Sequence, residues 1–360
     1  MKRSFVFWVS LLLVMVFMVL MAGCTSPAVS NGEPANKDGE ATQVFKLSLA
    51  HFFPASHPVE KVLLKQWTEA IEEATAGRVI ITSYPGETLS KASEIYDGVV
   101  TGIADLGLSC FSYTRGRFPV TEAFELPGIT YNNSKVASKV AWEGIKELDP
   151  QELKDTKLMM VLATGPGDLF TKKPIRELND LQGVEIRATG LSAKTLEMLG
   201  AIPVAMSQPE AYESLSKGII TGNLAPVEVL QGWKHAEVTD YLTLTPFLYN
   251  TLFFITMNLE TWNSLPADLQ EIIEDINEEY HEKLACGLWD MQNEEALQWS
   301  VEKMGMEIFT LSEEETEKWI SLLQPIQDEF VDKLEKQGLQ GEDILNKVKE
   351  LASYYNEIYK

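Results

Sequence analysis

Apolar and polar residues along the first part of the chain follow the spacings of strands and helices. In FKLSLA, residues 45–50, apolar side chains recur at alternate positions, which predicts a strand. Residues 58–75 place their apolar side chains on one face, which predicts an amphipathic helix. The same reading predicts a strand over 78–84, a helix over 93–101 and a strand over 104–109. This order of elements favours βαβ units and a mainly parallel sheet.

A second series of the same kind follows a predicted helix over 133–147. Strands are predicted over 157–163 and 184–189, and helices over 192–199 and 210–218. The chain therefore contains two α/β halves in tandem, with no short internal repeat that would indicate a solenoid.

The segment 267–304 predicts one very long helix. Apolar residues recur every four positions from Ile272 to Leu288, and the segment contains no proline. At 1.5 Å per residue such a helix is about 57 Å long, which exceeds the width of one small lobe. We expect it to lie across both lobes, with a possible kink at Gly287.

The N-terminus predicts export. Lys2 and Arg3 precede an apolar run that ends in LMAGC, and this pattern is typical of a secretory signal peptide over 1–23. An uncleaved membrane anchor is the alternative, because the run is almost long enough to span a bilayer. The end of the run resembles a bacterial lipobox, which implies a lipid on Cys24. The rest of 24–44 is rich in Ser, Pro, Asn and Gly and predicts a flexible tether.

The net charge limits the classes of partner and ligand, and the cysteine content limits the possible disulfides. The net charge of −23 argues against a nucleic-acid partner, and it means that any anionic ligand must be held by a locally placed cation. Beyond Cys24 there are only Cys110 and Cys286. A disulfide between them is possible, but we favour two buried thiols.

Motifs for catalysis, metal binding and nucleotide binding are absent from the sequence. It has no HExxH or CxxC for a metal, no GxSxG nucleophile elbow and no Walker loop. Glu122 and Glu125 are interpreted as solvated rather than as an acid–base pair. We therefore expect no enzyme activity, no cofactor and no metal.

Several segments together resemble the solute receptors of tripartite ATP-independent periplasmic (TRAP) transporters, the DctP-like class. They are GRVIITSYPGETL, IYDGVVTGIADLGL, FELPGI, KPIRELNDLQGVEIRATG, LGAIPVAMSQPEAYESLSKG and MNLETWNSLPADLQ. The resemblance implies a periplasmic-binding-protein-like clam of two α/β lobes, joined by crossing strands and spanned by a long helix. It also implies a small organic acid as ligand and TRAP membrane subunits as partners. The expected lobes are 45–164 with 253–290, and 165–252 with 291–360.

Arg187 is the first candidate for ligand binding. It ends the predicted strand VEIR, and ligands of open α/β sheets lie at the carboxyl ends of strands. A guanidinium there can bind a carboxylate through two parallel hydrogen bonds. A surface arginine paired with a glutamate is the alternative, but the resemblance places Arg187 at the family's ligand arginine.

Other candidates are aromatic or polar residues near the expected cleft. For each aromatic the alternative is ordinary core packing, and for His51 and His57 it is a hydrogen-bonded loop histidine. The set with Arg187 is His51, Phe52, Ser109, Phe111, Tyr113, Gln208, Asn223, Trp233 and Tyr249, and the neighbouring Phe53 and Phe253 belong to the same aromatic group.

Departures from the family pattern point to the ligand class. Many members have a basic residue just before the Lys-Pro-Ile motif, but here 165–170 has none, and TGNLAP at 221–226 replaces usual polar residues. An apolar pocket favours a ligand with a large apolar part. We expect an aromatic or bulky apolar monocarboxylate, such as an aryl 2-oxo acid or aryl acetate. The alternatives are a C4-dicarboxylate, which would need a second cation such as Arg115 or Arg117, and a sensing lipoprotein. An exported hydrolase is a more distant alternative.

Overall fold

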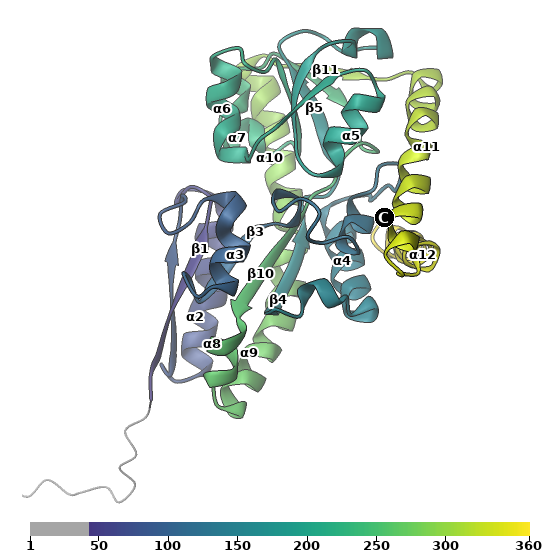
Figure 1. Cartoon of the computed structure of the whole chain (residues 1–360). Coiled ribbons are helices and arrows are strands. Elements are labelled where there is room, and N and C mark those ends of the chain that lie inside the picture. The colour runs from purple at the N-terminus through teal and green to yellow at the C-terminus, as the bar shows by residue number, and fades with distance from the viewer. Residues whose placement is uncertain (1–42) are drawn as a thin grey trace, which may run out of the picture. The chain divides into compact units, whose positions relative to one another are not determined.

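The computed structural model describes residues 43–360 (Figure 1). The predicted signal peptide, Cys24 and most of the predicted tether lie outside the described residues. Within 43–360 no helix is both long enough and apolar enough to cross a membrane.

The first lobe is built on a five-stranded mixed sheet in the order β2-β1-β3-β10-β4. β1 is parallel to β2 and β3, whereas β10 is antiparallel to β3 and β4. Four of these strands match predicted ones, and β10 was not predicted. The strands are β1 (Phe45–His51), β2 (Val79–Tyr84), β3 (Leu106–Cys110), β4 (Thr156–Ala163) and β10 (Leu252–Asn258).

Helices cover both faces of this sheet, so its central strands are buried. Every residue of β3 and of β10 is buried. Gly107 in β3 allows close packing of the next helix, because a Cβ there would lie 2.6 Å from Cγ2 of Ile95 and 2.7 Å from Cγ2 of Val99. The helical segments of this lobe are η1 (Val59–Leu64), α2 (Lys65–Ala74), η2 (Ala92–Glu94), α3 (Ile95–Val100), η3 (Phe111–Tyr113), η4 (Thr121–Glu125), α4 (Ser134–Leu148), η5 (Gln151–Leu153), α8 (Leu259–Ser264) and α9 (Ala267–Tyr280).

The second lobe is built on a six-stranded sheet in the order β11-β9-β5-β8-β6-β7. β5 is antiparallel to β8 and β9, and the other pairings are parallel. The strands are β5 (Asp168–Thr171), β6 (Glu185–Ala188), β7 (Ile202–Ala205), β8 (Gly222–Ala225), β9 (Tyr241–Leu244) and β11 (Glu307–Thr310). Its shorter helices are η6 (Leu178–Leu181), α5 (Leu191–Met198), α6 (Gln208–Ser216), α7 (Val229–Gly232) and η7 (His235–Glu237).

The chain crosses between the sheets three times, and the third crossing runs through α9 and α10 (Leu288–Met304) to β11. The first two crossings explain why neither sheet is as parallel as predicted. β4 leads into β5 and β9 leads into β10, so each sheet receives one antiparallel strand from the other lobe. The two crossing segments, 164–167 and 245–251, lie side by side. The N–H of Thr164 donates to the carbonyl of Thr251 (3.1 Å), and the N–H of Gly167 donates to the carbonyl of Tyr249 (3.0 Å). Two of the expected lobe boundaries, 164/165 and 252/253, fall in or beside these segments, whereas 290/291 falls within α10.

The long helix predicted over 267–304 is present but interrupted. α9 is followed by a π-helical turn, η8 (His281–Ala285), and then by α10 (Leu288–Met304). The N–H of Cys286 donates to the carbonyl of His281, five residues earlier, and Gly287 precedes α10. α9 packs against α2 and β4 of the first lobe, and α10 packs against α7 of the second. Figure 1 shows the two segments running past both lobes.

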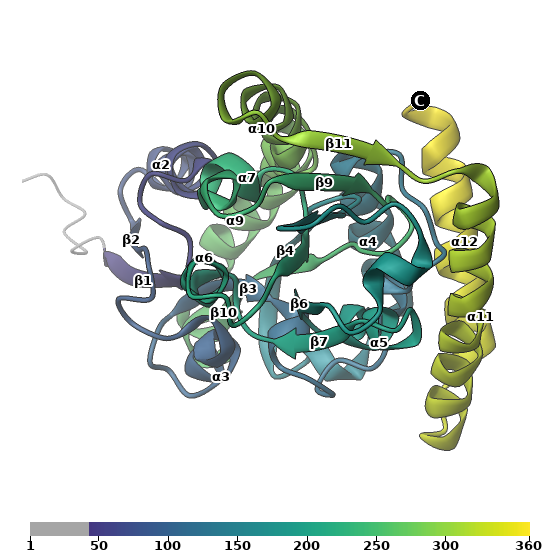
Figure 2. The same cartoon turned by 90° about the horizontal axis from the view of Figure 1, so that it is seen from above.

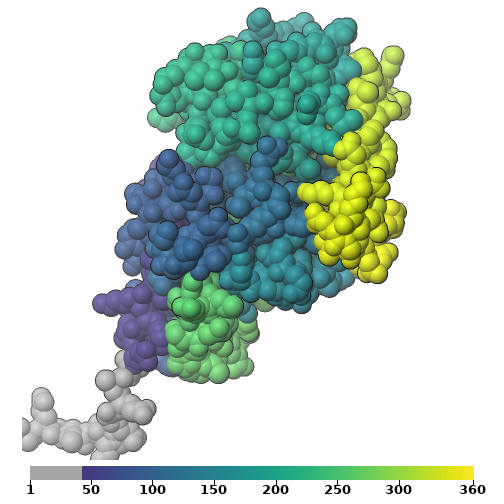
Figure 3. All heavy atoms as spheres, in the orientation of Figure 1, coloured from purple at the N-terminus to yellow at the C-terminus, as the bar shows by residue number. Residues whose placement is uncertain are grey.

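Two helices at the C-terminus lie next to each other along one side of the molecule (Figure 2). α11 (Glu313–Lys336) contacts α5, whereas α12 (Gly341–Ile358) packs its buried face, which includes Val348 and Leu351, against α4. The assignment of 291–360 as a whole to the second lobe is therefore wrong for α12. In Figure 3 the blue atoms of the first lobe and the teal atoms of the second meet along a seam.

Candidate functional site

Arg187 lies in β6 with its side chain buried between the lobes. It is 2% exposed. Its Nε donates to the carbonyl of Met206 (3.0 Å), and its Nη2 donates to the hydroxyl of Tyr113 across the lobe boundary (3.3 Å). Its Nη1 has no hydrogen-bond partner, and the guanidinium forms no ion pair, among the described residues. The alternative of a surface arginine paired with a glutamate is therefore wrong.

A small cavity of about 20 Å³ lies against Arg187, which we call the Arg187 cavity. Its walls come from both lobes and from both crossing segments. A cavity of this size holds about one water molecule. The lining residues are Phe52, Phe53, Cys110, Tyr113, Thr164, Arg187, Gln208, Pro226, Glu228, Val229, Trp233, Tyr249, Thr251 and Phe253.

Phe52, Phe53 and Trp233 form an aromatic wall of the Arg187 cavity. The rings of Phe52 and Phe53 stack with centroids 4.3 Å apart, and Trp233 from the other lobe lies 6.1 and 6.0 Å from them. Phe52 also lies 5.6 Å from Tyr113. The Nε1 of Trp233 is buried without a hydrogen-bond partner among the described residues. This wall is therefore apolar, with one unused donor.

Arg187 is the only lysine or arginine that lines the cavity. Burial raises the pKa of Tyr249 to about 12, and burial also raises the pKa of the Cys110 thiol well above its usual value, so both groups are uncharged. Glu228 is the only carboxylate in the lining. Its Oε2 accepts a hydrogen bond from Nε2 of His57 in the first lobe (3.1 Å).

His235 contacts two of the predicted ligand-binding residues, Gln208 and Asn223. Its Nε2 lies 3.1 Å from Nε2 of Gln208, and its Nδ1 lies 3.1 Å from Nδ2 of Asn223. Burial, and then the charge of Arg187, lower the pKa of His235 to about 3. The imidazole is therefore neutral and adds no second cation beside Arg187.

Six of the ten predicted ligand-binding residues line the Arg187 cavity: Phe52, Tyr113, Arg187, Gln208, Trp233 and Tyr249. Phe53 and Phe253, which belonged to the predicted aromatic group, line it as well. Two lining residues that were not predicted, Cys110 and Glu228, each lie at or just beyond the end of a strand. The other lining residues that were not predicted are Thr164, Pro226, Val229 and Thr251.

Four predicted residues do not line the cavity. Nε2 of His51 lies 2.9 Å from Glu60 and 3.0 Å from Ser83 within the first lobe. The hydroxyl of Ser109 donates to the carbonyl of Ala92 (2.7 Å), and Asn223 faces His235. Phe111 packs edge-on against Phe118 and Phe254. For His51 the hydrogen-bonded alternative is correct.

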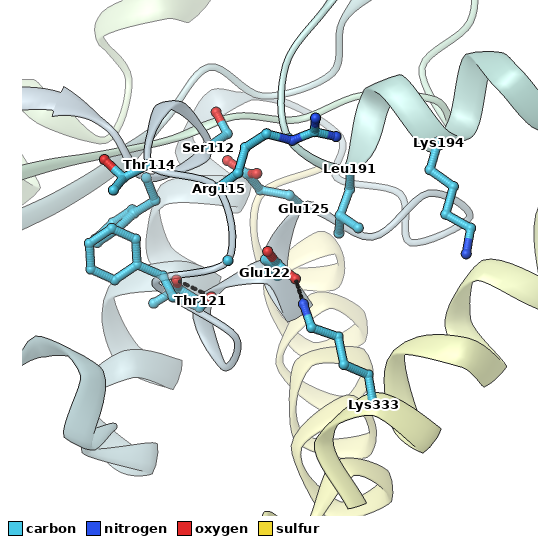
Figure 4. Close-up of a pocket in the computed structure, with 13 residues that line it drawn as sticks. Ser112, Thr114, Arg115, Thr121, Glu122, Glu125, Leu191, Lys194 and Lys333 are labelled. Carbon is cyan, nitrogen blue, oxygen red and sulfur yellow. Dashed lines mark hydrogen bonds and ion pairs between the residues drawn. The ribbon is translucent and has the colours of Figure 1, made fainter. Parts of the chain in front are cut away.

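A second cavity of about 260 Å³, the Arg115 cavity, has Arg115, Glu122, Glu125 and Lys333 among its lining residues (Figure 4). Glu122 accepts a hydrogen bond from Lys333 there (2.7 Å). Glu125 is only 8% exposed, and burial raises its pKa to about 8 although the N–H of Leu252 donates to it. The interpretation of Glu125 as solvated is therefore wrong.

Neither of the two arginines considered as a second cation lines the Arg187 cavity. Arg115 lines the Arg115 cavity, and Arg117 forms ion pairs with Asp97 and Asp155. Asp168 is also turned away from the site, because its carboxylate accepts the N–H of Thr245 (2.6 Å).

Cys110 and Cys286 are both free and buried, which confirms the prediction of two buried thiols. Among residues 43–360, no group of three or more His, Cys, Asp or Glu side chains is arranged to hold a metal ion.

Comparison with known proteins places these features in context. The family model described as "Bacterial extracellular solute-binding protein, family 7" (DctP) matches residues 49–334. Curated relatives are matched over 64% to 93% of their own length. One of them, the C4-dicarboxylate-binding periplasmic protein DctP of Rhodobacter capsulatus, is 25% identical over 87% of this chain and 93% of that protein.

Solved structures similar to this chain have the same fold. A TRAP periplasmic solute-binding protein from Desulfovibrio salexigens is 34% identical, with a TM-score of 0.76 over 86% of this chain and 96% of that one. A TRAP solute-binding protein from Rhodoferax ferrireducens with copurified benzoate is 26% identical, with a TM-score of 0.82 over 88% and 100%. A marine metagenome TRAP protein specific for aromatic acid ligands, in complex with 3-hydroxybenzoate, is 29% identical, with a TM-score of 0.82 over 87% and 99%. The predicted two-lobed α/β fold is confirmed.

Proposed function

This chain belongs to bacterial extracellular solute-binding protein family 7, the DctP family, and from that premise we propose that it is the receptor of a TRAP transporter for an aromatic or bulky apolar monocarboxylate. The ligand binds between the lobes, with its carboxylate on Arg187 and its apolar part against Phe52, Phe53 and Trp233. Aryl acetates and aryl 2-oxo acids are the specific ligands we propose. The proposal includes no catalytic step and no cofactor.

The observation that carries this proposal is the state of Arg187. A guanidinium that is 2% exposed and has no carboxylate partner among the described residues is costly to bury. The cost is offset when an anion accepts its free N–H groups. A carboxylate fits best, because it can accept two parallel hydrogen bonds from one guanidinium.

The lining of the Arg187 cavity supports a monocarboxylate with a ring. Its single cation can neutralise one carboxylate, and a second carboxylate buried without a partner would cost several kcal/mol. Contact of a ligand ring with the aromatic wall removes apolar area from water at about 25 cal/mol per Å². Favourable ring geometry adds roughly 0.5–1.5 kcal/mol per pair. The aromatic ligands of the two similar proteins described above are consistent with this chemistry.

Ligand entry requires the lobes to separate. A cavity of about 20 Å³ is too small for an aromatic ring, and its walls belong to both lobes. We place the hinge at the crossing segments 164–167 and 245–251, with 45–164 and 253–290 in one lobe and 165–252 and most of the remaining chain in the other. α12 moves with the first lobe, because it packs on α4.

A C4-dicarboxylate is the second candidate ligand class, and the relative from Rhodobacter capsulatus is named for it. It would need another cation in the Arg187 cavity, which Arg115 could supply only by leaving its own cavity. A receptor that reports to a sensor rather than to a transporter is the second candidate role. Genes for two TRAP membrane subunits beside this one would favour transport. We also propose an extracytoplasmic location with a lipid on Cys24, which rests on the sequence of the N-terminus.

Native mass spectrometry of the protein purified without denaturation tests the proposal. We expect a copurified acid whose mass and fragmentation identify one carboxylate and an aromatic or bulky apolar group. Release of a C4-dicarboxylate from a substantial fraction of the protein would contradict the proposed ligand class. Unfolding in denaturant should release the bound acid, because it destroys the cavity between the lobes. Refolding then gives protein free of that acid.

A further inference from the structure

Glu228 is the only carboxylate in the lining of the Arg187 cavity, and the proposed function does not account for it. It lies just before α7 in the second lobe and is 4% exposed. Its partner His57, from the first lobe, is 2% exposed. The backbone N–H of Glu228 donates to Oδ1 of Asn293 in α10 (2.9 Å), which fixes the position of the residue.

The hydrogen bonds of His57 determine where its proton lies. Its Nδ1 accepts the backbone N–H of Val59 (3.1 Å), so this nitrogen carries no proton. The ring proton is therefore on Nε2, which donates to Oε2 of Glu228 (3.1 Å). His57 therefore donates to Glu228 through Nε2 and accepts through Nδ1.

The packing around Glu228 leaves its second oxygen free to accept a hydrogen bond. Oε1 has no partner among the described residues, whereas Oε2 is held by His57. Gly232 makes room for the pair, because a Cβ there would lie 2.6 Å from Oε2 of Glu228 and 3.3 Å from Nε2 of His57. The carboxylate is thus held in place with one acceptor unused.

We propose that Glu228, positioned by His57, determines specificity: it accepts a hydrogen bond from a donor on the apolar part of the ligand and rejects a second carboxylate. This inference rests on the proposed function, in which Arg187 holds the carboxylate. With one cation and one anion in a largely dehydrated cavity, a second carboxylate meets repulsion from Glu228 and finds no cation. A hydroxyl on the ring satisfies Oε1 instead.

Calorimetric titration with a matched ligand series tests this role. The series is phenylacetate, its 3- and 4-hydroxy derivatives and its 3- and 4-carboxy derivatives. We expect the better hydroxy isomer to bind wild-type protein at least about tenfold more tightly than phenylacetate, as a hydrogen bond to a charged group allows. The carboxy derivatives should bind more weakly than phenylacetate.

Glu228→Gln removes the charge and nearly preserves the shape. We expect the preference for the hydroxy ligand to fall below about threefold and the binding of the carboxy derivatives to improve at least about tenfold relative to phenylacetate. Glu228→Asp keeps the charge but moves it, so it should still reject the carboxy derivatives while losing hydroxyl preference. Glu237→Gln is the matched control, because it removes one negative charge at an exposed site where Tyr212 is the partner.

The outcomes separate this inference from the proposed function. Wild-type protein that binds phenylacetates, with all ligand ratios unchanged in Glu228→Gln, overturns the role of Glu228 and leaves the proposed function standing. Wild-type protein that binds succinate but none of the phenylacetates overturns the proposed function. If Glu228→Gln does not fold, Glu228→Asp decides: unchanged hydroxyl preference in that variant also overturns the role.

Discussion

Replacement of Arg187 by alanine should abolish ligand binding and leave the fold intact. The guanidinium is buried and is the only cation of the Arg187 cavity. Truncating one partner of a dehydrated charge pair costs about 2–5 kcal/mol. This free energy corresponds to a loss of affinity of about 30-fold to several thousand-fold.

The same substitution should change the stability of the ligand-free protein only slightly, because two effects oppose each other. The hydrogen bonds to Met206 and Tyr113 are lost, at about 1.5–3 kcal/mol each for a charged donor. The burial of an unpaired charge, which costs several kcal/mol, is lost as well. We therefore expect the melting temperature of Arg187→Ala to lie within a few degrees of that of wild type.

Isothermal titration and thermal unfolding of the same preparations measure both quantities. Arg187→Lys keeps the charge but loses the planar donor pair, so it should bind at an intermediate affinity. Arg117→Ala removes a partly exposed arginine that pairs with Asp97 and should bind like wild type. Near wild-type affinity in Arg187→Ala would refute the assignment of Arg187 as the carboxylate anchor.

Three further predictions concern lipidation of Cys24, the pH dependence of the free energy of unfolding and the packing at Gly107. A fatty-acid probe should label wild-type protein in its native host but not Cys24→Ser, and labelling of that variant at a processed N-terminus would disprove lipidation. Because burial raises the pKa of Glu125 from 4.5 to about 8, the folded state binds a proton that the unfolded state releases, so the free energy of unfolding should fall as pH rises from about 4.5 to 8. Urea unfolding of Glu125→Gln should show a smaller fall, and an equal fall would exclude Glu125 as a source. Gly107→Ala should destabilise the protein by about 1–3 kcal/mol in the same assay, because its Cβ would overlap Ile95. Gly287→Ala, where the nearest atom is 3.9 Å away, is the control, and equal losses in both variants would refute the packing argument.

The sequence predicted strand ends that line the Arg187 cavity, but not always the residue that lines it. Successive side chains of a strand point to opposite faces. Ser109 therefore bonds to Ala92 while its neighbour Cys110 lines the Arg187 cavity. His51 likewise faces Glu60, whereas Phe52 lines the cavity. Alternation alone does not say which face is the ligand face.

Some features could not be predicted because they depend on contacts between residues that are far apart in the sequence. His57 and Glu228 are 171 residues apart and meet only because the lobes meet, so no local pattern connects them. β5 and β10 were not predicted. Every residue in both strands is buried, so neither shows the alternation of a half-exposed strand, although the equally buried β3 was predicted. The long helix was predictable because its apolar spacing is local, although the π-helical turn at His281 was not.

A thermal-shift comparison of ligand classes tests the central claim most directly. Benzoate, phenylacetate and phenylpyruvate are compared with succinate, malate and fumarate on wild-type protein freed of any bound acid. A ligand at 100 times its Kd stabilises the folded state by about 2.7 kcal/mol. The account predicts that the aromatic monocarboxylates raise the melting temperature by several degrees and that the C4-dicarboxylates do not. The opposite ranking would contradict it and would show that a second cation reaches the Arg187 cavity.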